Sequence, residues 1–419
     1  MTKFKRSAQS QPKHGKPPSS GASKAPVAAP IHRPGWTGPS YIRKVAKKTP
    51  PTVKNASLTE QIQSLSVDHQ QLILDTVRNT FPAVDEFNAL KPVLRAVREA
   101  LEQKDYCTAF GTEDFIEAYT IRWCPSRALT SANVLAWICS EMGEAAWVQQ
   151  FLHHDRQKPA KIACFGRGGS DLLACVALLK HSHPSKIGQI PRLESSSPDA
   201  TRTDNVSTTA SHVEPDDKDS AMIDLNLIDR HDWSGVITKL HHTLTYPPPL
   251  SKYATAKAHA ANVSALPSQA LNLAVNQINI LESESSDLRA MIGPDPTLIT
   301  FLFTLQEFYS TSIANTTAFL LRLTLAAPKG SLLLVVDGPG ADAALSDSSS
   351  KGEEKSYPLE WLLYRALLPP STDSEEEVQP AWVKLINDGH EKEYKIPAAL
   401  RYPGSLENTK FQVHLLERL

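Results

Sequence analysis

Residues 163–179 of this chain read ACFGRGGSDLLACVALL. The short apolar run that ends at Phe165 predicts a buried strand, and the apolar run after Asp171 predicts a buried or amphipathic helix. The glycines between them permit a tight turn in which the backbone faces whatever lies above the strand end. In an open α/β sheet, a nucleotide-like ligand binds at this end of the first strand. The same turn also occurs in folds without a ligand, so the rest of the chain has to decide.

Charge is distributed unevenly along the sequence. The chain has 44 Lys and Arg against 45 Asp and Glu, but residues 1–59 contain twelve of the cations and no acidic residue. A basic arm rich in proline, serine and lysine is typical of segments that bind nucleic acid or direct a protein to the nucleus. The alternative is a tail that only aids solubility. We expect residues 1–56 to be a disordered basic tail.

The five cysteines lack the spacing of a metal site, and their odd number does not suit a disulfide framework. Cys164 and Cys175 lie within apolar runs and are expected to be buried thiols. No apolar stretch approaches the length of a membrane span, and the N-terminus lacks the hydrophobic core of a secretory signal. The sequence therefore predicts a soluble intracellular protein that needs neither a membrane nor a metal.

Helical patterning precedes the expected sheet. It begins near Ser57, which has the spacing of a capping box with Glu60. We expect an all-helical N-terminal region over residues 57–155 and a larger α/β domain over residues 156–419. Three insertions rich in polar residues are expected in that domain, at about 184–220, 341–355 and 370–379.

Strands and helices alternate after Lys161, which predicts a parallel, doubly wound sheet. A final strand with charged neighbours suits an antiparallel position near the edge. This order of elements fits the seven-stranded sheet of class I, Rossmann-like S-adenosylmethionine-dependent methyltransferases. It fits a dinucleotide dehydrogenase less well, because the turn reads G-R-G-G rather than G-x-G-x-x-G.

Polar residues follow the expected strands at the end where a cofactor would bind. Asp229 closes the second strand and can accept hydrogen bonds from a ribose diol, or it is a solvated loop carboxylate. Asp232 is a competitor, although it also suits the start of the next helix. Asn279 follows the third strand and can accept a hydrogen bond from an adenine amino group, or it stabilises a turn. The expected cofactor-binding residues are Phe165, Gly166, Gly168, Gly169, Asp171, Asp229, Asp232, Trp233, Asn279 and Thr304.

The end of the fourth strand carries an amide and a carboxylate, Gln306 and Glu307, between aromatic residues. Such a pair can hold the edge of a planar nucleobase, while Phe308 and Tyr309 stack on its face. The alternative is that Glu307 caps the next helix and the aromatic rings belong to the core. We expect Glu307 and Gln306 to be the catalytic residues.

Two arginines surround a tryptophan and a proline in the segment IRWCPSRAL, residues 121–129. Arg122, Trp123 and Arg127 suit a lid over an anionic, aromatic ligand such as RNA. The alternative is a turn at a helix end with surface arginines.

Several of these segments occur together in one known family. The segment around Trp123, the glycine turn, LIDRHDWS at residues 227–234 and FTLQEFY at residues 303–309 resemble the fungal 25S ribosomal RNA uridine N(3)-methyltransferases. The resemblance covers about residues 58–183 and 221–419 and includes LRYP at residues 400–403. The chain departs from the commoner methyltransferase pattern because no acidic residue precedes Gly166 and because Asn279 replaces a carboxylate.

The resemblance implies transfer of a methyl group from S-adenosylmethionine to N3 of a uridine in large-subunit ribosomal RNA. It also implies that the protein acts in the nucleus, within the nucleolus. It implies ribosomal RNA or a pre-ribosome as the partner, and we expect a monomer. The uracil imide must lose a proton during this reaction, and Glu307 is the candidate base, with Gln306 on the uracil edge. Two alternatives remain open: a nucleotide-binding oxidoreductase, and a non-catalytic ribosome-assembly factor that binds RNA on the same fold.

Overall fold

The computed structural model describes residues 60–153, 158–184, 221–260, 262–340, 342–345, 355–369, 379–386 and 390–419. The expected basic tail and most of the three expected insertions lie outside these residues. All described residues belong to one compact unit, Ser57–Leu419.

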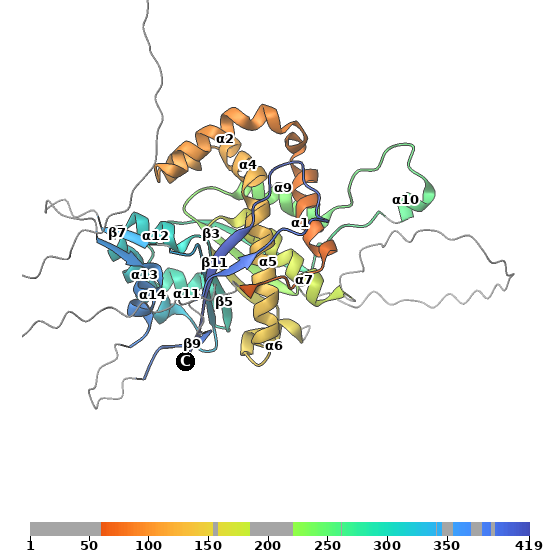
Figure 1. Cartoon of the computed structure of the whole chain (residues 1–419). Coiled ribbons are helices and arrows are strands. Elements are labelled where there is room, and N and C mark those ends of the chain that lie inside the picture. The colour runs from red at the N-terminus through yellow and green to blue at the C-terminus, as the bar shows by residue number, and fades with distance from the viewer. Residues whose placement is uncertain are drawn as a thin grey trace, which may run out of the picture. The chain divides into compact units, whose positions relative to one another are not determined.

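Strands form the centre of this unit (Figure 1). Seven of them lie in the order β4-β3-β2-β5-β6-β11-β9. Their bounds are β2 (Ala160–Phe165), β3 (Ile223–Asp229), β4 (Leu271–Gln277), β5 (Thr297–Leu302), β6 (Leu332–Asp337), β9 (Trp382–Ile386) and β11 (Thr409–Arg418). The first five are parallel to one another, whereas β11 runs antiparallel to both β6 and β9. The predicted seven-stranded, mostly parallel sheet with an antiparallel last strand is therefore confirmed.

Two short strands extend the sheet at β11. They are β10 (Lys392–Tyr394), which pairs with β11, and β1 (Glu60–Gln61), which pairs with β10. Glu60 forms an ion pair with Lys392 and so belongs to the sheet edge rather than to a helix. The expected capping box is therefore wrong: α1 begins at Val67, and its N-cap is Ser66.

A separate two-stranded antiparallel sheet joins β7 (Asp342–Leu345) to β8 (Lys355–Pro358). These strands flank a segment that was expected to be an irregular insertion. Backbone pairing therefore gives the described ends of this insertion a regular structure.

Residues of each central strand face two different cores. Ile162 and Cys164 of β2 belong to one hydrophobic cluster, and Ala163 and Phe165 belong to the other. This alternation follows from the two-residue period of a strand. A sheet with both faces covered is characteristic of parallel α/β folds.

Helices of the N-terminal region, together with α7 and α9, form one hydrophobic cluster with the first face, although α2 packs on α4 and lies away from the strands in Figure 1. These helices are α1 (Val67–Thr80), α2 (Phe87–Glu102), α3 (Tyr106–Ala109), α4 (Glu113–Arg122), α5 (Cys124–Glu141), α6 (Ala146–Leu152), α7 (Gly168–Ser182) and α9 (Ser234–Thr245). The opposite face is covered by α11 (Ser285–Ile292), α12 (Leu305–Thr311), α13 (Ile313–Ala326) and α14 (Leu359–Leu367). A short helix, α10 (Ala256–Ala260), lies between β3 and β4 in sequence.

The strand order reverses at β2, because β3 and β4 follow on one side of it and β5 and β6 on the other. In open α/β sheets, ligands bind in the crevice at the carboxyl ends of the strands where the order reverses. Here that crevice lies between the ends of β2 and β5, at Phe165 and Leu302.

The turn after β2 approaches the turn after β5 closely. Gly166 has a φ of 128°, a conformation that residues with a side chain rarely adopt. A Cβ atom at this position would lie 2.8 Å from the Cβ atom of Thr304. The hydroxyl of Thr304 donates a hydrogen bond of 2.8 Å to the carbonyl oxygen of Phe165, which ties the two turns together.

Gly168 serves a different purpose in the same turn. A Cβ atom there would lie 3.1 Å from Leu227 Cδ1 and 3.5 Å from Ile237 Cδ1. The missing side chain thus lets the first turn of α7 pack against the sheet.

Replacing Gly166 by alanine should destabilise the protein by about 1–3 kcal/mol, because the new methyl group adds both backbone strain and overlap with Thr304. Thermal unfolding of the full chain measures the effect. Gly143→Ala is the matched control, since no atom lies within 4 Å of a Cβ atom at that position. Equal melting temperatures for the two variants would show that the close approach to Thr304 is not needed.

Candidate active site at the carboxyl ends of the strands

Arg167 connects the glycine turn to the opposite side of the crevice. Its side chain is buried and forms an ion pair with Glu307 of α12. The guanidinium also lies 5.1 Å from the ring centroid of Phe110 and 5.4 Å from that of Tyr119. A cation held between a carboxylate and two aromatic faces is positioned with little freedom. Arg167 therefore connects Phe110 and Tyr119 of the helical region to Glu307 on the other side of the crevice.

Glu307 and Gln306 lie in the first turn of α12 rather than at the end of a strand. The strand β5 ends at Leu302, and two residues reverse the chain before the helix begins at Leu305. The predicted strand was too long, because the mainly apolar run of β5 continues through Phe303 to Leu305, where the helix begins.

Phe303 occupies this reversal with a φ of 62°. A bulky residue in the left-handed region is strained, and such residues cluster at functional sites. Its ring lies 5.8 Å from the guanidinium carbon of Arg127 on α5. The same guanidinium is 5.7 Å from the Tyr119 ring. The buried Nη1 atom of Arg127 has no hydrogen-bond partner among the described residues, so a ligand at this point would find an available donor.

Two buried carboxylates face these arginines. Asp171 lies in the first turn of α7, and Asp337 ends β6. Burial raises the pKa of each to about 7, and the attraction of Arg127 and Arg167 opposes this rise. Asp337 accepts a hydrogen bond of 3.3 Å from the backbone N–H of Gln306. One oxygen of Asp171, Oδ2, has no hydrogen-bond partner among the described residues.

Asp229 lies at the end of β3, and its side chain is largely buried. Its Oδ1 atom accepts a hydrogen bond of 2.7 Å from the backbone N–H of His231, and the ring Nδ1 of His231 lies 3.0 Å away. Asp232 instead accepts a hydrogen bond of 2.9 Å from the backbone N–H of Ser234, at the start of α9. The hydrogen bonds from Ser234 lower the pKa of Asp232. Asp232 therefore stabilises the start of α9, which is the alternative role that the sequence suggested for it.

A cleft of about 380 Å³ opens beside these residues. It lies between the start of α4 and the ends of β3 and β4. Its lining residues are Phe110, Gly111, Thr112, Glu113, Ile116, Arg230, His231, Asp232, Ser234, Gly235 and Gln277.

Several predicted site residues are buried beneath the crevice or in the core. Phe165 is fully buried and stacks on Phe301 at 5.3 Å. Tyr309 is buried and Phe308 is partly buried in the core on the α13 and α14 side, as the alternative interpretation expected. Trp233 is buried against Phe110, at 5.7 Å between ring centroids.

Asn279 is half-buried and begins a turn, since its carbonyl oxygen accepts a hydrogen bond of 3.1 Å from the backbone N–H of Glu282. Its side chain donates a hydrogen bond of 2.8 Å to Glu282. A contact with adenine remains a prediction for this residue.

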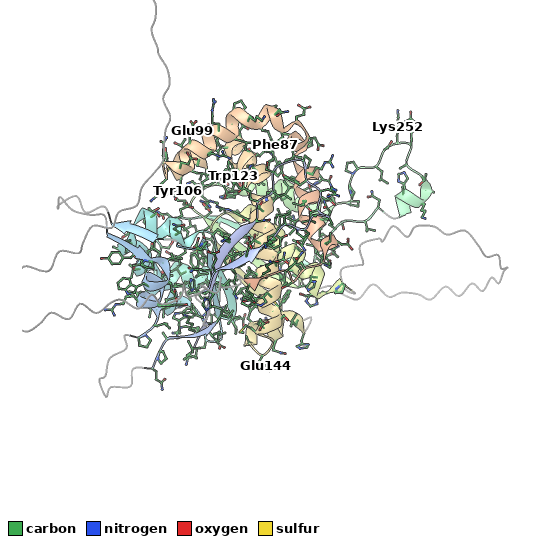
Figure 2. All side chains as sticks on the ribbon, viewed as in Figure 1. Phe87, Glu99, Tyr106, Trp123, Glu144 and Lys252 are labelled. Atoms are coloured by element: carbon green, nitrogen blue, oxygen red, sulfur yellow. The ribbon has the colours of Figure 1, made fainter. Side chains whose placement is uncertain are left out.

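Arg122 and Trp123 occupy different environments although they are adjacent. Arg122 is buried, forms an ion pair with Glu407 and donates a hydrogen bond of 3.2 Å to the carbonyl oxygen of Ser405. Trp123 stacks on Tyr119 at 5.3 Å and is partly buried. Figure 2 shows Trp123 and Tyr106 on the helical region. A role for Arg122 in binding substrate remains a prediction, whereas its contacts hold α4 to the C-terminal segment.

Sequence reasoning missed two prominent residues of this crevice, Arg167 and Asp337. It placed the ring of Phe303 among the aromatic residues around Glu307 but missed its backbone conformation. Asp337 had a readable signal, because it ends the otherwise apolar strand LLLVVD. The strain at Phe303 had none, since no residue type there predicts a left-handed backbone.

The groups at the crevice match the chemistry of S-adenosylmethionine. That cofactor carries a ribose diol, an ammonium, a carboxylate and a sulfonium. A carboxylate at the end of the second strand of the fold suits the diol. The partnerless oxygen of Asp171 and the partnerless Nη1 of Arg127 are an acceptor and a donor for an amino-acid group.

The reversed strand order, the antiparallel strand next to β6 and this polar crevice define a class I, Rossmann-like methyltransferase. The chain belongs to the family described as "Putative SAM-dependent methyltransferase", which matches residues 77–417. S-adenosylmethionine is therefore its cofactor, and the oxidoreductase alternative is set aside.

Individual known proteins are similar over most of the chain. The 25S rRNA (uridine(2843)-N(3))-methyltransferase of Saccharomyces cerevisiae is 26% identical over 353 residues, which are 81% of this chain and 83% of that protein. A solved O-methyltransferase family protein from Burkholderia thailandensis is 10% identical and covers 86% of this chain and 75% of its own, with a TM-score of 0.29. An S-adenosylmethionine-dependent methyltransferase from Clostridium acetobutylicum is 8% identical and covers 68% and 98%, with a TM-score of 0.26.

Among the described residues, no helix is long and apolar enough to cross a membrane. The same part of the chain contains no group of three or more His, Cys, Asp or Glu side chains that could hold a metal ion.

Replacing Arg122 by methionine should lower the free energy of unfolding by about 1–3 kcal/mol, because it removes a buried charged donor from Glu407 and Ser405. Chemical denaturation measures the change. Arg95→Met is the control, since Arg95 is 76% exposed and its pair with Glu99 spans 3.8 Å; it should cost about 0.5 kcal/mol or less. If Arg122→Met keeps full stability yet weakens RNA binding, the arginine acts on the substrate instead.

Proposed function

We propose that this protein transfers a methyl group from S-adenosylmethionine to N3 of a uridine in large-subunit ribosomal RNA. The observation that carries the proposal is the position of Glu307, whose carboxylate reaches across the crevice to the glycine turn. The name of the yeast relative, 26% identical over 81% of this chain, supports the choice of uridine N3 as the acceptor.

The acceptor nitrogen requires a base. N3 of uracil carries a proton between two carbonyl groups, and this proton must leave as the new nitrogen–carbon bond forms and the sulfur–carbon bond breaks. When bound, the cofactor supplies the activated methyl group on its sulfonium. Glu307 accepts the proton in this proposal, and Gln306 beside it holds the edge of the uracil.

Arg167 orients Glu307. The guanidinium pairs with Oε2 of the carboxylate that would receive the proton. The position of the guanidinium is itself set by Phe110 and Tyr119. The other carboxylate oxygen, Oε1, therefore accepts the proton in this proposal while the ion pair persists.

The walls of the crevice suit a planar base. Arg127 lies over the ring of Phe303, and Trp123 stacks on Tyr119 nearby. Enzymes that modify a nucleobase take it out of the stack and hold it between aromatic or apolar side chains. Arg127 and Trp123 are thus retained as substrate-binding residues in the proposal.

The cofactor residues follow from the ends of the other strands. Asp229 accepts hydrogen bonds from the ribose diol, as an acidic residue at this strand end does in related folds. The backbone from Gly166 to Gly169 borders the amino-acid end. Together these residues orient the cofactor toward the crevice that contains Glu307.

The basic arm extends the proposal to the location of the protein. Residues 1–59 carry twelve cations, and the rest of the chain carries 32 cations against 45 acidic residues. A cationic arm can bind phosphates regardless of the nucleotide sequence. Pre-ribosomal RNA in the nucleolus is the partner and place that this arrangement supports.

Replacing Glu307 by glutamine should slow methyl transfer by about a hundred- to ten-thousand-fold, because the side chain keeps its size but loses its basicity. Cofactor affinity should change far less. Single-turnover methylation of ribosomal RNA fragments, followed by digestion and mass spectrometry of 3-methyluridine, measures the rate.

Glu144→Gln is the matched control, because Glu144 is exposed and lies well away from Trp123 in Figure 2. A rate within a few-fold of the parent for Glu307→Gln would remove this carboxylate from the chemical step. Absence of any 3-methyluridine with the parent protein would favour the non-catalytic assembly factor.

Deleting residues 1–56 should leave cofactor binding unchanged but weaken RNA binding and reduce its dependence on salt, because fewer phosphates are neutralised. Titration of labelled RNA at several salt concentrations measures both quantities. A full-length variant with its tail lysines and arginines changed to glutamine separates charge from length. An unchanged salt slope in both variants would leave the tail without a role in binding.

A further inference from the structure

The crevice contains more negative than positive groups. It combines two guanidinium groups with four carboxylates, which interact electrostatically across the ends of β2, β3 and β6. These residues are Arg127, Arg167, Asp171, Asp229, Asp337 and Glu307. When all six are ionised, the carboxylates outnumber the guanidinium groups by two. The crevice therefore favours a ligand with positive charge.

Partnerless polar atoms point to a ligand independently of this charge. Tyr119 and Asp171 are each 1% exposed. Neither the hydroxyl of Tyr119 nor Oδ2 of Asp171 has a hydrogen-bond partner among the described residues. Buried polar atoms without a partner are rare because each costs free energy. A ligand that supplies both a donor and a positive charge would satisfy Asp171.

The two forms of the cofactor differ in charge. S-adenosylmethionine carries a sulfonium and an ammonium against one carboxylate, so its net charge is positive. S-adenosylhomocysteine has lost the sulfonium charge with the methyl group and is neutral overall. Charges interact more strongly in a partly buried crevice than in water. The crevice can therefore distinguish the two forms without a difference in shape.

We propose that Asp171 and Asp337 make this crevice selective for charge, so that it holds S-adenosylmethionine more tightly than S-adenosylhomocysteine. Methyl transfer then weakens cofactor binding. The bonding electron pair stays on sulfur when the methyl group leaves, so the product S-adenosylhomocysteine has a neutral thioether in place of the sulfonium. The inference rests on S-adenosylmethionine as the methyl donor in the proposed function. It does not depend on which base accepts the methyl group.

Protonation of the two carboxylates links this selectivity to pH. Burial raises the pKa of Asp171 and of Asp337 to about 7, so each is partly protonated at neutral pH in the free protein. A bound cation stabilises the ionised forms and lowers both pKa values. Binding therefore releases protons, and affinity for the cationic form rises with pH until about pH 7 and then levels off.

The neighbours of each carboxylate set the size of this effect. The Ser170 hydroxyl hydrogen-bonds to Asp171, which also interacts with the groups of five residues on α5, β2, β3 and the glycine turn: Arg127, Cys124, Cys164, Asp229 and Arg167.

Asp337 is surrounded by a different set of groups. It faces Arg127, Arg167 and the backbone N–H groups of Leu305 and Gln306. Both carboxylates thus share the two arginines, and Asp171 also feels the repulsion of Asp229.

Calorimetric titration of the full chain with each form of the cofactor tests the proposal. Between about pH 5.5 and about pH 8, the preference for S-adenosylmethionine should increase roughly tenfold for each unit by which a pKa falls on binding. Heats measured in buffers of different ionisation enthalpy should show proton release with S-adenosylmethionine and less with S-adenosylhomocysteine.

Asp171→Asn and Asp337→Asn should each reduce both the preference and the proton release. Asp114→Asn is the matched control, since Asp114 is exposed on α4, and it should change neither. Equal affinities of the parent protein for the two forms across this pH range would overturn the proposal, whether or not the variants fold. Loss of uridine methylation with intact charge selectivity would contradict only the choice of substrate.

Discussion

The contact between the turn after β2 and the turn after β5 is the constraint on which the site depends. Gly166 and Thr304 approach so closely that no side chain fits at the glycine, and the Thr304 hydroxyl holds the Phe165 carbonyl. This contact lies where the strand order reverses, and it brings Arg167 within reach of Glu307. Two segments far apart in the sequence thereby become the two sides of one crevice.

Most of the sheet could be predicted from the sequence, because buried parallel strands appear as continuous apolar runs between turns. The alternation of strands and helices expected after Lys161 is what the structure shows, and the apolar run LLLVV at residues 332–336 forms most of β6. The start of the helical region was harder to place. Glu60 resembled a capping residue, but pairing with Lys392, more than three hundred residues away in sequence, decides its structure. Local patterns carry no information about such a partner.

The site was predictable only in part, for the same physical reason. Polar residues that follow apolar runs, such as Asp229 at the end of β3 and Glu307 in the first turn of α12, were visible because they interrupt those runs. The partner that fixes the geometry of Glu307 is Arg167, 140 residues away in sequence, whereas His231 holds Asp229 from two residues away. Phe308 and Tyr309 were expected to stack on the base, but both pack into the core. The reason is that residues 305–311 form a helix, in which neighbouring residues face different directions.

The position of β11 has a consequence for how the chain reaches its folded state. This strand follows every other strand of the sheet in the chain, yet it lies inside the sheet, between β6 and β9. During synthesis the preceding strands leave the ribosome with one edge of β6 unpaired. Unpaired edges of this kind favour contacts with other chains. The edge of β6 therefore stays open to such contacts until β11 has been synthesised and pairs with it. Folding without aggregation requires that β11 pairs quickly or that the edge is covered until then.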